Sequence, residues 1–575
     1  MKIKHYFGLA VIAAMTASCS SNEDLGTAGP GTGTNEAGVG YATFSINLPT
    51  TSGTRAGDPT FDKGDDDEYK VNDATLLIFK QGKATKEGDY TFVESAELGS
   101  MAPWKDPSET GVTTHAKITA KLEQVDKTDG YYALVLLNNG TGKNVKVTLP
   151  EKNAKFSDWN VDTNKDKEAT NKIANYDNGF YMANAPLFKD NNVTTLVAID
   201  KDKIYPTEEQ AAKSAATDVY VERGLAKVSL GTGTTTAKPV TSVTYQGDEV
   251  TISKWALDVT NKKAYPIHNV DGLTTEFPTI WSNDATTAST TNKATTQRFV
   301  DNNDKTSVKR VYWGKDPNYD NKDNDKTALN AEFNYVANAN VKEDPDKPLY
   351  CLENTFNLDN MKQGQTTRVV FKATYKPASL PKGETTFYKI GKNTAIWSEA
   401  DLVKEIEAAV ASVVSGAAGK TTVTLNAGAG KNNITAAGTH YITEDNISVT
   451  DATITITPEN IKAINTQLGL KEAEKVGIST YEGGESYYIA RIKHFGDDLT
   501  QWKSGTYGEN NLEYLGRYGV LRNNWYVLTV QSVSGPGYPS VPEVKPNTPD
   551  DEDDNYINVS VKILSWAKRS QDVNL

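Results

Sequence analysis

The sequence predicts a mostly β protein with two β-sandwich domains, a few short helices and long loops. Apolar runs of strand length recur along the chain between Gly and Asn turn signals, a pattern typical of sandwiches. A strand-length segment near each end alternates apolar and polar residues with period two, so each would bury one face and expose the other. Few segments have the apolar spacing of an amphipathic helix.

Residues 1–18 are expected to be a signal peptide. Two early lysines precede an apolar run that is too short to span a bilayer as a helix. The following Thr16-Ala17-Ser18-Cys19 resembles a bacterial lipobox, with Thr16 where Leu is preferred, so we expect Cys19 to carry lipid. The alternative is an ordinary secretory peptide with an incidental cysteine. Lipidation of Cys19 would leave Cys351 without an intramolecular disulfide partner.

Residues 19–55 are expected to form a lipidated propeptide that contains the first strand. A spacer rich in Ser, Gly and Thr would follow the lipid. Strand 42–48 comes next, with four apolar positions on one face, namely Ala42, Phe44, Ile46 and Leu48. A Gly/Thr/Ser-rich loop then contains Arg55 and Ala56. A cut between Arg55 and Ala56 would free the strand.

The N-terminal sandwich is expected over residues 56–232. Its predicted strands are 74–79, 131–137, 194–199 and 219–221. The run 131–137 is nearly continuous in apolar residues, which indicates a strand buried on both faces. A short helix is predicted over 206–215, because Pro206 stands early and two glutamates occupy the first turn. A Thr/Gly-rich break at 231–236 marks the predicted boundary.

The C-terminal sandwich is expected over residues 233–534. Its predicted strands are 240–245, 255–259, 487–492 and 526–530. One helix is predicted after Ser398, which can cap it together with Asp401, and another begins at Pro458 behind Thr457. The segment 271–346 is rich in Asn, Asp and Thr, so we expect long surface loops there.

The end of the chain predicts a tether and a donor strand. Residues 535–555 are Pro-rich and then acidic, as expected of an extended tether. In the tail 556–575 the apolar positions are Ile557, Val559, Val561 and Ile563, followed by Leu564 and Trp566. This pattern could replace strand 42–48 in another copy of the chain. The sequence leaves open whether the tail is free or docked before cleavage.

Catalytic and metal-binding motifs are not expected. His115, His268, His440 and His494 have no partner at zinc spacing, so each is expected to be a surface or half-buried structural residue. The Gly-rich run 416–421 departs from a phosphate loop because Val414 stands where Gly is required. The acidic runs 62–67 and 316–325 lack the full calcium-loop pattern. We therefore predict a non-enzyme without a cofactor.

Charge and hydropathy restrict the partners. The net charge is −13 and no long basic run is present, so nucleic acid is not an expected partner. No apolar stretch of membrane-spanning length follows the signal peptide, so membrane attachment would be through lipid.

Several motifs together resemble the Bacteroidales fimbrillins, and among them the Mfa1-type stalk subunit of short fimbriae. The resemblance spans nearly the whole chain and is weakest from about 270 to 480. It is carried by the order and spacing of these pieces: the lipobox at Cys19, Arg55-Ala56-Gly57-Asp58, Val221-Glu222-Arg223 with Ala226-Lys227, Val520-Leu521-Arg522-Asn523-Asn524-Trp525-Tyr526, Trp566, and the final Asp572-Val573-Asn574-Leu575.

The resemblance implies two transthyretin-like β-sandwich domains and a structural role in a cell-surface fimbria. The precursor would be exported as an outer-membrane lipoprotein, and an Arg-specific surface protease would cut after Arg55. Subunits would then form a homopolymer by C-terminal strand exchange, together with anchor and tip subunits, and the fimbria would support adhesion.

Two alternatives stay open. One is a surface-anchored glycan-binding lipoprotein, which would keep lipidated Cys19 permanently. The other is a fimbrial tip or anchor subunit in place of a stalk subunit.

Overall fold

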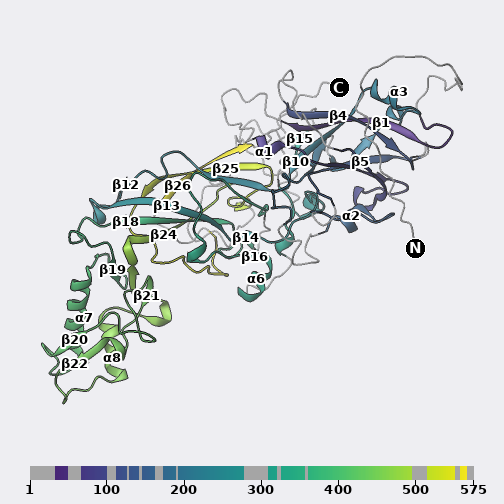
Figure 1. Cartoon of the computed structure of the whole chain (residues 1–575). Coiled ribbons are helices and arrows are strands. Elements are labelled where there is room, and N and C mark those ends of the chain that lie inside the picture. The colour runs from purple at the N-terminus through teal and green to yellow at the C-terminus, as the bar shows by residue number, and fades with distance from the viewer. Residues whose placement is uncertain are drawn as a thin grey trace, which may run out of the picture.

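The computed structural model describes residues 33–49, 66–99, 112–125, 129–141, 145–161, 172–189, 192–276, 309–311, 313–319, 326–355, 360–494, 514–550 and 557–565. The described parts form an elongated molecule, with an N-terminal β domain at one end, a second β domain in the middle and a lobe with helices α7 and α8 at the other end (Figure 1). The predicted fold class, mostly β with a few short helices, is confirmed.

The N-terminal domain is built on a sheet with the order β3-β2-β5-β6-β10-β1-β4, and β9 also pairs with β5. Its two edge strands, β3 and β4, contact each other, so the sheet curls around a core. The strands are β1 (Gly40–Pro49), β2 (Ala74–Lys80), β3 (Thr91–Glu97), β4 (Val112–Leu122), β5 (Tyr131–Leu137), β6 (Met182–Asn184), β9 (Val197–Ile199) and β10 (Thr217–Arg223). Short helices are α1 (Asp66–Tyr69), α2 (Phe156–Trp159) and α3 (Glu208–Ala212).

Apolar residues lie on both faces of this sheet. One core contains inward side chains of β1, β2, β4, β5 and β10. The opposite face of β2 and β5 packs in a second core with Phe156 and with Ala264, Ile267 and Leu352 from beyond the domain. Strand β5 is therefore buried on both faces, as its nearly continuous apolar sequence predicts.

The middle domain packs two sheets around one core, as a sandwich does. One sheet has the order β17-β11-β25-β26 and the other β12-β13-β18-β24. The core between them includes Trp255, Phe371, Tyr488, Tyr526 and Leu528. The strands are β11 (Ala226–Leu230), β12 (Lys238–Pro239), β13 (Glu249–Asp258), β17 (Leu349–Cys351), β18 (Arg368–Lys376), β24 (Glu485–Arg491), β25 (Asn524–Val533) and β26 (Ile557–Ser565).

Small elements occupy parts of the connecting segments. Strand β14 (Thr260–Asn261) pairs with β16 (Phe333–Asn334), and β15 (Lys309–Arg310) pairs with β7 (Leu187–Lys189), which pairs with β8 (Asn192–Thr194). Helices α4 (Leu273–Glu276) and α6 (Lys326–Glu332) lie within the predicted loop region 271–346.

The boundary between the two domains lies earlier than the predicted break at 231–236. Strand β10 belongs to the first sheet and β11 to the second, so the chain crosses at Gly224 and Leu225. A Cβ on Gly224 would lie 2.9 Å from Cγ2 of Ile173, so the crossing is tightly packed. Because the crossing interrupts no apolar run, composition does not reveal it. The Thr/Gly-rich break is a turn of the second domain, where Gly231 donates its N–H to the carbonyl of Leu528.

Two predicted strands are wrong in detail. The segment 240–245 forms a 3₁₀ turn at Val243–Tyr245, because the Ser242 hydroxyl accepts a hydrogen bond from the Thr244 N–H. The segment 194–199 is divided between β8 and β9. The helix predicted over 206–215 is present in shorter form as α3, with Thr207 as its N-cap.

The distal lobe (residues 387–481) is inserted between β18 and β24, which are antiparallel neighbours. It has its own core, which includes Leu402, Ile406 and Ile464. Both predicted helix starts are confirmed, with Ser398 capping α7 and Thr457 forming a capping box at α8. The elements are β19 (Phe387–Ile390), α7 (Glu399–Val413), β20 (Thr421–Val423), β21 (Gly438–His440), β22 (Ile447–Val449), α8 (Pro458–Gln467) and β23 (Ile478–Tyr481).

Candidate functional site

Strand β1 occupies an interior position in the N-terminal sheet. It pairs with β4 in antiparallel fashion at ten positions and with β10 in parallel fashion at four. We call the gap between β4 and β10 that β1 fills the β1 slot. Both neighbours use their backbone groups on β1, so the sheet cannot lose this strand without leaving two unpaired edges.

Three of the predicted apolar positions of β1 have described side chains, and all three lie in the core. Ala42, Phe44 and Ile46 are each 0% exposed and pack in the first core. Leu48 lies in β1 opposite Thr114 of β4. The period-two pattern predicts this burial of the inner face. Its prediction of an exposed outer face is wrong, because Thr43 and Asn47 on that face are only 2% and 7% exposed.

The outer face of β1 is polar and lies beneath α3. The Thr43 hydroxyl donates to the carbonyl of Ala211 in α3, 2.8 Å away, and lies 2.8 Å from the Thr119 hydroxyl of β4. Asn47 contacts the Asp218 carboxylate of β10, with 3.5 Å between Nδ2 and Oδ1. This face was not singled out in the sequence, although its polar residues belong to the same alternation.

The processing residues lie outside the described part of the chain. This applies to Cys19, Arg55 and Ala56. The described chain ends at 49 and resumes at 66, so the predicted cleavage site falls in the segment that joins β1 to α1.

Glu68 in α1 attaches the segment after this site to the middle domain. Its carboxylate pairs with Nζ of Lys227 at 2.6 Å, and both side chains are buried. The Tyr350 hydroxyl donates to the same carboxylate at 2.5 Å. Nζ of Lys227 lies 3.7 Å from the centre of the Trp525 ring. A cut at Arg55 would therefore leave the chain from Glu68 onward held in place.

The C-terminal strand β26 is docked on its own chain. It forms nine pairs with β25 and has no second neighbour among the described strands of that sheet. Strand β26 contains the predicted donor residues Ile557, Val559, Val561, Ile563 and Leu564. Trp566 lies outside the described residues. The question that the sequence left open is answered for this state of the chain, because β26 is an edge strand of the middle domain.

Most of the predicted tether is packed against the middle domain. Tyr538 exchanges backbone hydrogen bonds with Tyr487 of β24, and Asp550 donates its N–H to the carbonyl of Met361. The side chains of Tyr538, Val541 and Val544 pack into apolar clusters. Residues 535–550 are therefore not an extended spacer, because apolar side chains between the prolines attach them to the surface.

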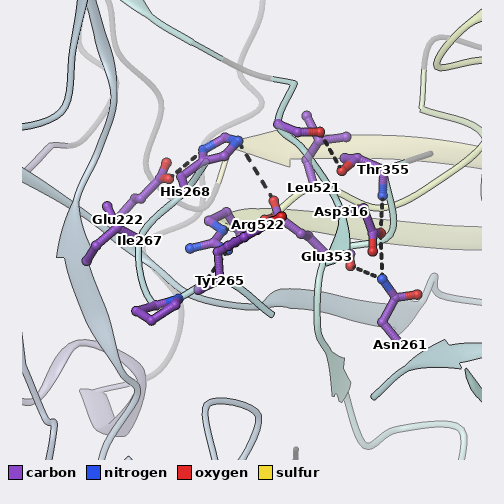
Figure 2. Close-up of polar contacts among 12 residues, drawn as sticks. Glu222, Asn261, Tyr265, Ile267, His268, Asp316, Glu353, Thr355, Leu521 and Arg522 are labelled. Atoms are coloured by element: carbon purple, nitrogen blue, oxygen red, sulfur yellow. Dashed lines mark hydrogen bonds and ion pairs between the residues drawn. The ribbon is translucent and has the colours of Figure 1, made fainter. Parts of the chain in front are cut away.

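A buried polar cluster joins the two domains (Figure 2). Nδ1 of His268 lies 2.9 Å from the carboxylate of Glu222 in β10, and its Nε2 lies 4.0 Å from that of Glu353. Arg522 donates to Glu353 at 2.6 Å. His268 is 1% exposed, which corrects the expected surface or half-buried position. A side chain on Gly314 would clash with the imidazole, so Gly is required there.

Asp316 lies beside this cluster and accepts hydrogen bonds from the side chain of Asn261 and the backbone of Thr355. Burial, together with the nearby Glu353 carboxylate, raises the pKa of Asp316 to about 7. Among the residues that the structure describes, no group of three or more His, Cys, Asp or Glu is placed to hold a metal ion. Within the same ranges, no helix combines the length and apolar character needed to cross a membrane.

The distal lobe contains a cleft of about 1070 Å³ between α8 and the segment around β21. Its lining mixes polar and apolar residues and includes Tyr441, Ile461, Lys462, Asn465 and Glu472. The side chain of Asn465 is bonded to the backbone of Ile442, so it helps to shape the cleft.

The end of the chain is similar to a fimbrial family. Residues 479–572 match the family described as "Major fimbrial subunit protein type IV, Fimbrillin, C-terminal". The matched segment contains β24, β25 and β26. No curated protein matches the sequence.

Solved structures similar to this chain share little sequence with it. A Parabacteroides distasonis protein whose description proposes a role in cell adhesion has a TM-score of 0.37 at 9% identity, covering 92% of this chain and 98% of its own. The C-terminally truncated tip fimbrial protein Mfa3 of Porphyromonas gingivalis has a TM-score of 0.27 at 11% identity, covering 92% and 100%. A fimbrial assembly protein of P. distasonis has a TM-score of 0.23 at 10% identity, covering 62% and 93%. The C-terminal segment, by its match, is thus similar to the major fimbrial subunits.

Proposed function

We propose that this chain is a structural, non-catalytic subunit of a cell-surface fimbria. The precursor is an outer-membrane lipoprotein attached through Cys19, and an Arg-specific surface protease cuts between Arg55 and Ala56. Release of β1 opens the β1 slot, and the tail of another copy fills it. The repeated exchange produces a homopolymer, the stalk, to which anchor and tip subunits are added and which supports adhesion.

The observation that carries the proposal is the position of β1. It is an interior strand whose connection to the rest of the chain passes through the segment containing Arg55. One cut therefore removes its covalent link to the domain. Loss of the strand would expose the core residues that contact Ala42, Phe44 and Ile46 and would unpair the edges of β4 and β10, which favours capture of a new strand.

Backbone pairing favours transfer of the tail from its own chain to the β1 slot of another copy. On its own chain β26 of the tail is an edge strand, and β25 is its one neighbour among the strands that the structure describes. In the β1 slot it would have two neighbours, β4 and β10. Each additional backbone hydrogen bond contributes roughly 0.5–1.5 kcal/mol, so the second ladder favours the intermolecular position.

Cleavage also provides control over assembly. Before the cut, β1 is present at the high effective concentration of a tethered segment and excludes a competing strand. After the cut, β1 can dissociate, whereas the chain from Glu68 onward stays attached through Lys227 and Tyr350. The match of the C-terminal segment to fimbrillins supports the donor role of the tail.

The test uses purified full-length precursor and an Arg-specific protease. The wild type should give ladders of polymers, and the mature chain should begin at Ala56. Arg55→Ala should remain monomeric, and a deletion of 556–575 should be cut but remain monomeric. Polymerisation of the deletion variant at the wild-type rate would contradict strand donation by the tail.

A glycan-binding lipoprotein is the second candidate, and the cleft of the distal lobe, which combines Tyr441 with charged and amide side chains, favours it. Such a protein would keep a lipidated Cys19 at its N-terminus on the cell surface. N-terminal sequencing of the surface form separates the two candidates: a start at Ala56 supports the fimbrial subunit, and a blocked, lipidated start supports the binding protein. Labelled protein along the whole fibre, seen by electron microscopy, would separate a stalk subunit from a tip or anchor subunit.

A further inference from the structure

We infer that the tail enters the β1 slot in a single register, in which Ile557 takes the place of Ala42 and Lys562 the place of Asn47. This inference rests on the proposed strand exchange and adds which side chains of the slot select the register. The selecting features are the apolar pocket around Phe44 and the polar outer face formed by α3 and Asp218.

The alternation of the two strands restricts the register. Positions 42, 44 and 46 point into the core and positions 43 and 47 are covered by polar partners. A shift of one residue would place the polar residues of the tail in the core, so only even shifts are compatible with burial.

Shifts of two residues in either direction create a mismatch. With Val559 in the place of Ala42, Leu564 falls beside Asp218 in the place of Asn47, and Ser565 takes the place of Leu48. With Ile557 in the place of Phe44, Asn555 falls in the place of Ala42, which is 0% exposed. Burial of an amide there without a partner costs about 1–3 kcal/mol.

The unshifted register matches the polar and apolar alternation on both faces. Ile557, Val559, Val561 and Ile563 then occupy the inner positions of Ala42, Phe44, Ile46 and Leu48. On the outer face Ser560 coincides with Ser45, and the amide of Asn558 stands where the Thr43 hydroxyl donates to the Ala211 carbonyl. Lys562 stands beside the Asp218 carboxylate, which contacts Asn47 in the uncleaved chain.

The charges around this position favour a cation. Asp218 is exposed at the edge of the outer face. The nearest lysine on β4, Lys117, donates to the carbonyls of Ala212 and Ser214 at the end of α3. Lys562 would add an ion pair with Asp218, and an exposed pair of this kind changes affinity by a small factor.

The inner face allows a stricter test of the register. The residue that replaces Phe44 enters a pocket shaped for an aromatic ring, and Val559 leaves part of it empty. A Phe introduced into the tail should be accepted only at the position that enters this pocket. At any other inner position it would overpack the core, which lowers affinity about tenfold or more.

The experiment cuts the full-length precursor in the presence of excess labelled peptide 556–575 and measures peptide capture. We expect Val559→Phe to be captured at least as well as the wild-type peptide, and Ile557→Phe and Val561→Phe about tenfold less. Best capture of either of the latter two, or equal capture of all three, would overturn the single register. Failure of the wild-type peptide to bind would instead refute the proposed function.

The Lys562–Asp218 ion pair provides an independent test of the register. Lys562→Glu should reduce capture about two- to fivefold, and Asp218→Lys in the precursor should restore it. Because Asp218 is exposed, its substitution leaves the core unchanged. Ser560→Thr is the matched control, since it keeps the hydroxyl at the position shared with Ser45. An equal loss in the charge-swapped pair would contradict the role assigned to Asp218.

Discussion

A disulfide between β1 and β4 should separate cleavage from assembly. Thr43 and Thr119 are directly opposed in the two strands, and their hydroxyl oxygens are 2.8 Å apart. Cysteines at both positions are therefore close enough for a disulfide. The native Cys351 should not compete, because it is buried and burial raises the pKa of its thiol to about 12.

The structure gives the size of the effect. The two residues are 76 positions apart, so the disulfide should stabilise the uncut precursor by about 4.5 kcal/mol in the chain-entropy model. After the cut at Arg55, the disulfide keeps β1 tethered at an effective concentration on the order of millimolar. A tail of equal affinity at about 1 µM would then fill the β1 slot about a thousand times less often.

The assay compares oxidised and reduced Thr43→Cys/Thr119→Cys precursor after treatment with the Arg-specific protease. Both forms should be cut, but only the reduced form should give polymer ladders, and adding reductant to the oxidised form should start assembly. The single variant Thr43→Cys controls for the loss of the Thr43 hydroxyl. Assembly of the oxidised, cut protein at the rate of the reduced protein would refute the account.

Three further predictions concern stability. Phe44→Ala should destabilise the precursor by about 3–5 kcal/mol in denaturant unfolding, because Phe44 is fully buried; a change below 1 kcal/mol would contradict its place in the core. Burial raises the pKa of Glu87 to about 7, so the folded chain holds this proton more tightly than the unfolded chain does. The wild type should therefore lose about 1–3 kcal/mol of stability as pH rises from 4.5 to 7. Glu87→Gln should remove this loss, since the Gln carbonyl can still accept from the backbone N–H of Leu196. Ser398→Ala should destabilise the distal lobe by about 0.5–2 kcal/mol, measured by hydrogen exchange in α7; unchanged exchange would contradict the capping role.

The local elements were predictable because their signals are local. The period-two pattern located β1 and β26, and the hydroxyls of Ser398 and Thr457 marked the starts of α7 and α8. These patterns depend on neighbours within a few residues, so the sequence contains them directly.

The interdomain cluster could not be predicted, because its members come from distant segments. Glu222, His268, Glu353 and Arg522 approach one another only after both domains have formed. The sequence around His268 has no partner at short spacing. The domain crossing at Gly224 was missed for a related reason, since a two-residue turn between strands leaves no change of composition.

The tether was mispredicted because composition outweighed a few apolar residues. Prolines and acidic residues in 535–555 indicate an extended chain. Tyr538, Val541 and Val544 nevertheless pack against the middle domain. Because β26 is paired with β25 in the uncut chain, the tail would have to leave β25 before donation. The tail residues alone predicted a strand, but not which edge it occupies in the uncut chain.

One cross-link would test the central claim most directly. In the single register that we infer, Asn558 of one subunit lies opposite Thr119 of the next, the position that Thr43 holds before cleavage. Within one chain Asn558 is paired with Ser532 in the middle domain, so it cannot reach Thr119 there. Thr119→Cys/Asn558→Cys filaments should give a covalent ladder on a non-reducing gel, whereas filaments that form but run as monomers under oxidising conditions would contradict the exchange.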